Sequence, residues 1–115
     1  MSQQFVSLLA LPATLTGTVA ANRFVSAVFA QSGADANAIG VSRTGGVSGD
    51  RVTVDVEGTA VVEAGAAVAA GATIKADALG RAIPWVTSGA RVAIALEAAS
   101  AAGQFIEVLQ ISNAA

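Results

Sequence analysis

The segment GDRVTVDVEG, residues 49–58, decides the fold class. Val52, Val54 and Val56 alternate with charged and polar residues, which is the period-two pattern of a strand with one buried face. A glycine bounds the pattern at each end, where a strand is expected to stop. The segment therefore predicts a half-buried β-strand over residues 51–57.

Short apolar runs of the same kind continue from this strand in both directions, separated by loops rich in Gly, Ser and Asp. The predicted strands are 22–30, 38–42, 51–57, 59–63, 72–76, 81–86, 90–97 and 104–112. About eight short strands with this punctuation predict an all-β fold, a small β-barrel or sandwich. Two Ala-rich pieces, 63–71 and 97–103, are expected to hold one or two short helical turns, because their glycines disfavour longer helices.

Two parts of the chain share one order of elements. AIGVSRTGGVSGDRVTVDV (38–56) and VAIALEAASAAGQFIEVLQI (92–111) each run from a short apolar strand through a small-residue loop and a glycine to a longer strand, about 54 residues apart. FVSAVFAQSGA (24–34) precedes the first part much as RAIPWVTSGA (81–90) precedes the second. The pattern indicates either an internal duplication or chance similarity in a chain rich in Ala and Gly. Both interpretations predict two similar β-units that close on each other.

The composition predicts a surface that is covered by other protein. The 115 residues are most simply one domain, and 54% of them are hydrophobic. Only 12% are charged, about half the usual quarter. Much of the surface must therefore be small and apolar, which soluble monomers rarely expose in large patches.

The same composition excludes several classes of function. The net charge is -2 and the six basic residues are scattered, so no basic patch for nucleic acid is expected. The chain has no Cys, His or Tyr, and so lacks a thiolate nucleophile, the commonest general base and the commonest transition-metal ligand. We therefore expect no enzyme activity, no catalytic residue, no metal and no cofactor. Five carboxylates could in principle pair: Asp50, Asp55, Glu57, Glu63 and Asp77. Four of them lie at turns or on the polar face of a strand, and none is accompanied by a His, Cys or Tyr for acid–base relay.

The only lysine lies in VEAGAAVAAGATIKADALG, residues 62–80. A Val/Gly-rich hairpin around one lysine is typical of lipoyl and biotinyl carrier domains, where the lysine occupies the hairpin tip. Lys75 instead precedes the turn that follows residues 72–76, and alternation places it on the solvent face. We interpret Lys75 as a surface lysine.

The first 20 residues are unusually apolar. Their large apolar side chains are Phe5, Val6, Leu8, Leu9 and Leu11, followed by Pro12. The segment lacks the positively charged start of a secretory signal, and no stretch of the chain approaches the ~18 apolar residues of a membrane span, so no membrane is expected as a partner. Two interpretations stay open: a first strand at the edge of the core, or an arm that packs on a neighbouring subunit. We expect an N-terminal arm over residues 1–20 and one β-barrel domain over residues 21–115.

Residues 38–111 resemble the capsid cement, or head decoration, proteins of tailed bacteriophages. The shared elements are an early G-V strand, G-D-x-V-x-V-x-x-E-G, A-x-x-x-A-G-A-x-I followed by D-x-x-G-R, and A-L-E-A-A-x-A-x-G-x-x-I-x-V near the end. The resemblance implies a compact β-barrel on the outer surface of the virion capsid, made in the host cytoplasm. It also implies that the protein locks neighbouring major capsid proteins together, commonly as a trimer and in some branches as a dimer. Residues 1–37 depart from this pattern, since they are longer and more apolar than the family's entry strand.

We therefore expect a structural protein whose partners are the major capsid protein and other copies of itself, with a trimer favoured over a dimer. An alternative is another homo-oligomeric β-module of a phage tail or spike, or of a bacterial protein shell. The residues predicted to form the interface are Phe5, Val6, Leu8, Leu9, Leu11 and Trp85.

Overall fold

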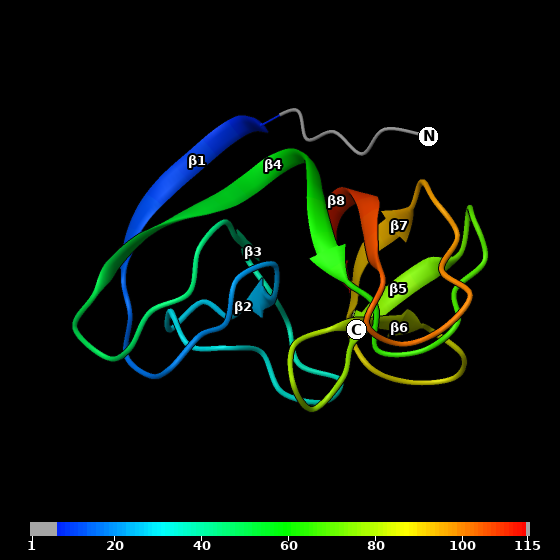
Figure 1. Cartoon of the computed structure of the whole chain (residues 1–115), viewed down its shortest axis with the longest axis horizontal. Coiled ribbons are helices and arrows are strands. Elements are labelled where there is room, and N and C mark those ends of the chain that lie inside the picture. Colours follow the sequence, from blue (N-terminus) through cyan, green and yellow to red (C-terminus); the bar gives the residue numbers. More distant parts are fainter. Residues whose placement is uncertain (1–6, 115) are drawn as a thin grey trace.

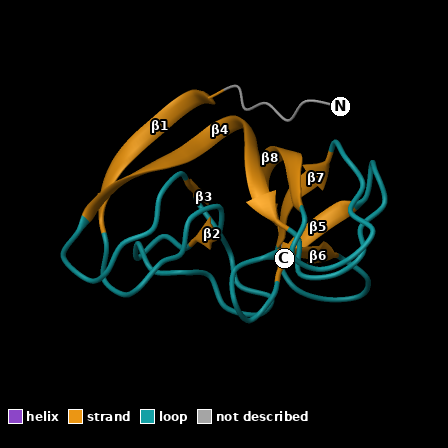
Figure 2. Cartoon of the chain, viewed as in Figure 1, coloured by secondary structure: helices purple, strands orange, loops and turns teal. Residues whose placement is uncertain are grey.

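The computed structural model describes residues 7–114, with side-chain positions for residues 9–111. These residues form eight strands and no helix (Figures 1 and 2). The strands are β1 (Ser7–Thr14), β2 (Phe24–Val25), β3 (Gly40–Ser42), β4 (Arg51–Glu63), β5 (Thr73–Ala76), β6 (Ala82–Pro84), β7 (Arg91–Ala95) and β8 (Phe105–Ala114). The predicted all-β fold is confirmed. Within the described part of the chain no helix is long and apolar enough to cross a membrane.

All eight strands belong to one sheet. Its order is β2-β3-β4-β8-β7-β5-β6, with β1 also paired to β4, and every named pair is antiparallel. The Gly65 amide donates to the Ala82 carbonyl at 2.8 Å, which links the end of β4 to β6. This link brings the two sides of the sheet together, so the strands form the nearly closed barrel seen in Figure 1.

The long central strand replaces two predicted ones. The predicted strands 51–57 and 59–63 are one strand of 13 residues, β4, which bends over the molecule in Figure 1. Its first half pairs with β1 and β3, and its second half pairs with β8. Because β4 pairs with strands from both halves of the chain, it connects the two halves within one sheet.

Two other predictions are wrong in detail. The predicted strand 22–30 shrinks to β2, because the chain turns at Ser26, whose amide donates to the Ala30 carbonyl at 2.8 Å. The helical turns expected in the Ala-rich pieces are absent from the described residues. In their place Val68 and Ala99 exchange two backbone hydrogen bonds of 2.9 Å, so the two pieces pair with each other instead of coiling.

Buried side chains form two clusters, which we call the main core and the minor core. The main core fills the barrel and contains Phe24, Ala38, Val41, Ala60, Val62, Ala64, Val68, Ile74, Ala76, Ala82, Ala90, Val92, Ala93, Ala95, Ala99, Ile106 and Val108. The minor core lies beneath β1 and the first half of β4 and contains Ala13, Leu15, Val19, Val25, Val52 and Val54. The small side chains bring backbones close together, as at Gly40, where an added Cβ would collide with the Asp55 carbonyl.

The two halves of the chain repeat the same hydrogen-bond pattern. We call residues 7–57 the first repeat and residues 59–111 the second repeat. The strand pairs Ala13–Val52 and Val62–Ile106 occupy equivalent places, and so do the pairs between β2 and β3 and between β5 and β7.

The loops repeat as faithfully as the strands. Val19 exchanges two hydrogen bonds with Gly46 as Val68 does with Ala99. Four more backbone amide-to-carbonyl bonds of the first repeat have an equivalent in the second. They are Leu15 to Asp50 (equivalent to Ala64 to Gln104), Gly49 to Leu15 (Gly103 to Ala64), Asn22 to Ser42 (Gly71 to Ala95) and Arg43 to Thr53 (Leu96 to Glu107). Chance similarity of composition would not reproduce these contacts, so the structure supports the internal duplication.

One part of the predicted repeat is misaligned. The sequence pattern aligns residues 24–34 with residues 81–90. In the structure β2 is equivalent to β5, because both pair with the strand that carries the equivalent of Gly40, which is Ala93. The sequence match failed because the residues of β5 share almost no side chains with those of β2.

Candidate interaction surface

Strand β1 lies at an edge of the sheet and turns one row of backbone groups outward. The Arg43 amide donates to the Thr53 carbonyl at 3.1 Å, so Thr53 directs its backbone groups toward β3. Its partner in β1 is Pro12, which therefore turns its own backbone groups away from β4. Proline has no N–H to offer a ladder and is tolerated in strands at such edges. Within residues 7–114, β1 pairs with β4 alone.

Two of the predicted interface residues lie on this strand with exposed side chains. Leu9 is 44% exposed and Leu11 is 37% exposed. Leu8 belongs to β1, although its side chain lies outside the described part, and Phe5 and Val6 lie outside the described residues altogether. The structure thus brings the leucines together on β1, which is a strand paired to the sheet. The division into an arm over 1–20 and a domain over 21–115 remains a proposal.

The sixth predicted interface residue, Trp85, is far from β1 in the strand order, because it follows β6. Its indole Nε1 donates to the Gly89 carbonyl at 2.9 Å. The Arg91 guanidinium lies 4.2 Å from the centre of the indole ring, a cation–π contact. Trp85 is half-buried and held by these contacts, while the adjacent Val86 is exposed. The structure therefore does not join Trp85 and the leucines into one surface.

Lys75 is less exposed than its position in the sequence predicts. Its side chain is only 15% exposed and its ammonium lies 2.7 Å from an Asp35 carboxylate oxygen. It also donates to the Ser88 carbonyl at 3.2 Å. The alternation of β5 was read correctly, since Ile74 and Ala76 are buried. The loop that carries Asp35 covers the outer face of the strand, and no local pattern reveals this.

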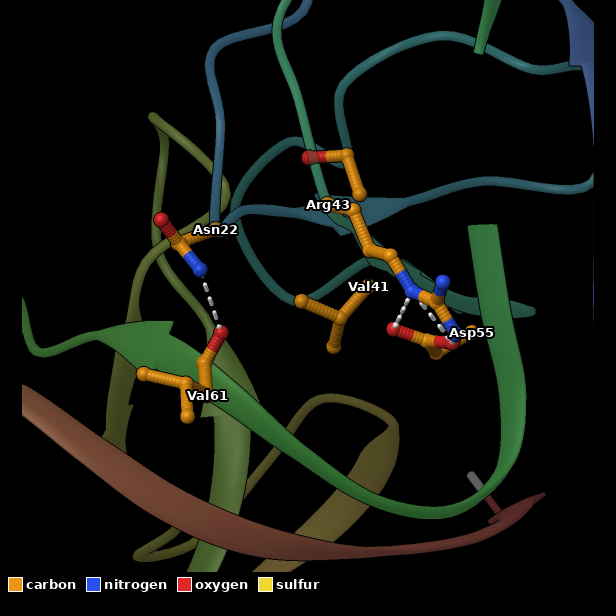
Figure 3. A pocket seen from close by; sticks show the side chains of 6 residues that line it. Asn22, Val41, Arg43, Asp55 and Val61 are labelled. Atoms are coloured by element: carbon orange, nitrogen blue, oxygen red, sulfur yellow. Dashed lines mark hydrogen bonds and ion pairs between the residues drawn. The ribbon is translucent and has the colours of Figure 1, made fainter. Parts of the chain in front are cut away.

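An ion pair between exposed Arg43 and buried Asp55 lies in the first repeat, close to the point where β4 passes into the second repeat. Asp55 in β4 is 3% exposed. Its carboxylate accepts from Arg43 Nε at 3.0 Å and from Arg43 Nη2 at 2.7 Å (Figure 3). These hydrogen bonds, with the negative charge of Asp55, raise the pKa of the Arg43 guanidinium above its already high ordinary value.

The pair lines a pocket of about 140 Å³ at this junction. Its lining residues are Asn22, Val41, Ser42, Arg43, Asp55 and Val61. The polar side chains there bond to other parts of the chain. The Asn22 amide donates to the Val61 carbonyl at 2.9 Å (Figure 3), and the Ser42 hydroxyl donates to the Ala20 carbonyl at 2.7 Å. Of these contacts, only the bond from Asn22 to Val61 crosses from the first repeat to the second. No cluster of metal-ligating side chains occurs among the described residues.

Sequence reasoning missed these ionic contacts because their partners are distant along the chain. A further example joins Arg23 to Glu63 at 3.0 Å. The alternation also placed Asp55 on the polar face of its strand, which is wrong, because the structure buries its side chain to 3% exposure beside Arg43.

Fold and surface together define a small all-β module with one sheet edge and its leucines exposed. The sequence profile of the phage cement protein family matches residues 6–110, and the chain belongs to this family. The match begins well before residue 38, so the expected departure of residues 1–37 from the family pattern is wrong for all but the first residues. Strand β1 lies within the residues that match the family.

A solved structure shares this fold. The head fiber gp8.5 N base of bacteriophage phi29 is 18% identical in sequence, with a TM-score of 0.71 over 90% of this chain and 93% of that one. Comparison with curated proteins gives no match. The protein is a structural protein associated with the phage capsid, in a family that is structural and not enzymatic.

Proposed function

We propose that the protein binds the outer surface of the capsid and stabilises the shell by clamping neighbouring major capsid proteins. Family membership over residues 6–110 supports a role at the capsid, and the exposed leucines of β1 are the surface proposed to pack against a neighbouring subunit or the capsid. Each fully buried leucine contributes roughly 1.5–3 kcal/mol before ordering costs are subtracted. The named neighbour is a head fiber protein, which favours the phage head over a tail, a spike or a bacterial shell.

The proposal includes self-association, most simply as a trimer, and no catalytic step. Only 12% of the residues are charged, and association of copies removes exposed apolar surface from water. A structural role of this kind needs neither metal nor cofactor. Light scattering of the purified protein tests the self-association, and a strictly monomeric species in solution and on capsids would contradict it.

The clamp is tested by deleting residues 2–11. We expect a folded β-domain whose circular dichroism loses only the contribution of the deleted part of β1, because Ala13 and Leu15 of the minor core are kept. Retention on purified capsids under heat or chelator stress should fall, as measured by co-sedimentation. The double variant Leu9→Asp and Leu11→Asp should give the same loss without shortening the chain.

The matched control is Leu109→Asp, which changes a leucine of similar exposure on β8. Its retention should equal that of the unaltered protein. If the truncated chain folds and stays on the capsid undiminished, attachment lies elsewhere, with Trp85 and the loops around Gly45 and Gly89 as the next candidates. If the truncated chain fails to fold, these residues act as a core strand and the clamp assignment is wrong.

A further inference from the structure

Inside the chain, the second repeat docks on the first through an edge of β4. The Glu63 amide donates to the Asn22 carbonyl at 3.0 Å. The Asn22 side chain donates in turn to the Val61 carbonyl at 2.9 Å (Figure 3). Arg23 adds an ion pair to Glu63 at 3.0 Å. The first strand of the second repeat therefore has its outer edge covered by the segment around Asn22.

The equivalent edge in the first repeat is open. The pairing registers make Pro12 and Thr14 of β1 equivalent to Val61 and Glu63 of β4. Both residues of β1 turn their backbone groups away from β4, and both are exposed. No segment within residues 7–114 pairs with this edge.

In the second repeat, the segment equivalent to the one around Asn22 is also exposed and covers no strand edge within the described residues. Gly71 is equivalent to Asn22, since its amide donates to Ala95 as that of Asn22 donates to Ser42. Both have left-handed backbone, with φ of 86° and 60°. Gly71 is exposed, together with the two residues before it. The contact between repeats is thus head-to-tail. Each chain leaves both sides of a further contact of this kind open: the outer edge of β1 and the segment around Gly71.

An apolar side chain beside the open edge is also left uncovered, whereas its equivalent in the second repeat is buried. Leu11 in β1 is equivalent to Ala60 in β4. Ala60 is 1% exposed and belongs to the main core, which also contains Phe24 and Val41 of the first repeat. Leu11 is 37% exposed because no preceding repeat lies against it. A longer side chain at the open position suits a contact with a second molecule.

We propose that the outer edge of β1 in one copy docks on segment 69–72 of a second copy, repeating between chains the contact that joins the repeats within a chain. This rests on the proposed self-association and names its surface. The Thr14 amide donates to the Gly71 carbonyl, and Leu11 is covered. Gly71 has no side chain, so the hydrogen bond from the Asn22 side chain to the Val61 carbonyl has no equivalent between the copies. A head-to-tail contact that closes gives a ring, and a trimer is the smallest ring beyond a dimer.

Disulfide cross-linking tests this arrangement, because the chain has no cysteine of its own. Thr14→Cys and Ala70→Cys are made separately, mixed and oxidised mildly, both as purified protein and bound to capsids. We expect a cross-linked dimer from the mixture and none from either variant alone. The control mixture pairs Thr14→Cys with Ala101→Cys, an exposed position in another loop, and should give none. A single chain carrying both cysteines should give a closed ring whose mass counts the copies, and Leu11→Asp in that chain should abolish it.

A Thr14→Cys variant that cross-links to itself would overturn the inference in favour of a two-fold contact between β1 strands. Absence of the mixed cross-link both in solution and on capsids would overturn it as well, and would leave the capsid protein as the partner of β1. The outcomes separate this inference from the proposed function. Cross-linked rings that do not bind capsids would contradict only the clamp, whereas capsid binding without cross-links would contradict only the docking mode.

Discussion

At the scale of single residues, the pairing of Arg43 with Asp55 stabilises the first repeat where β3 packs beside β4. A nearly buried carboxylate is costly unless it is hydrogen-bonded and paired, and Asp55 accepts from two nitrogens of Arg43. Arg43→Met keeps the aliphatic stem and removes the charge. Because the Arg43 side chain is 39% exposed and solvent screens the pair, we expect the variant to lower the free energy of unfolding by about 1–2 kcal/mol, measured as a lower urea midpoint at unchanged slope.

Arg51→Met is the matched control, because Arg51 is exposed at the start of the same strand. Its effect should stay within about 0.5 kcal/mol, and equal losses in the two variants would show that the Asp55 contact adds nothing. The raised pKa of Arg43 gives stability that is present below the ordinary pKa of arginine and is lost only as pH rises above it. Arg43 itself therefore adds no pH dependence near neutrality.

At the scale of elements, the loops before β4 and β8 use the same turn with a glycine in left-handed backbone. Gly49 has φ of 94° and Gly103 has φ of 93°, and an added Cβ would meet open space at both. Alanine at either position should cost about 1–2 kcal/mol through the backbone alone. Thermal or urea unfolding of Gly49→Ala and Gly103→Ala should therefore show similar losses. Gly33→Ala also enters open space but without the left-handed backbone, so stability should be unchanged or slightly higher.

The elements also show how far the sequence carries. Alternation along one strand is local, so it predicted the positions of β4, β7 and β8 well. Phe29 lies in the turn that follows β2 and adopts a φ of 62°, which local preference does not predict for a large side chain. The contact of Arg23 with Glu63 joins residues that are distant along the chain, so no local pattern predicts it. The open edge of β1 likewise depends on the order of strands in the folded sheet.

At the scale of the whole molecule, the two repeats share the main core, while the minor core belongs to the first repeat alone. Phe24 belongs to the first repeat, yet it is buried in the main core with Ile74 and Ile106 of the second. The Phe24 amide also donates to the Gly80 carbonyl at 2.8 Å. A defect in one repeat should therefore spread to the other, and the chain should unfold in one step.

Phe24→Ala tests this coupling. The cavity should lower the free energy of unfolding by about 3–5 kcal/mol, and the milder Phe24→Leu serves if the alanine variant does not fold. Fluorescence of Trp85, the only tryptophan, reports on the second repeat, while far-ultraviolet circular dichroism reports on all strands. Both signals should shift together to the same lower urea midpoint, because the transition is cooperative. Phe105→Ala removes an exposed ring of the second repeat and should change the midpoint far less. If Phe24→Ala instead separates the two signals, with Trp85 unfolding later, the repeats are independent units joined only by β4.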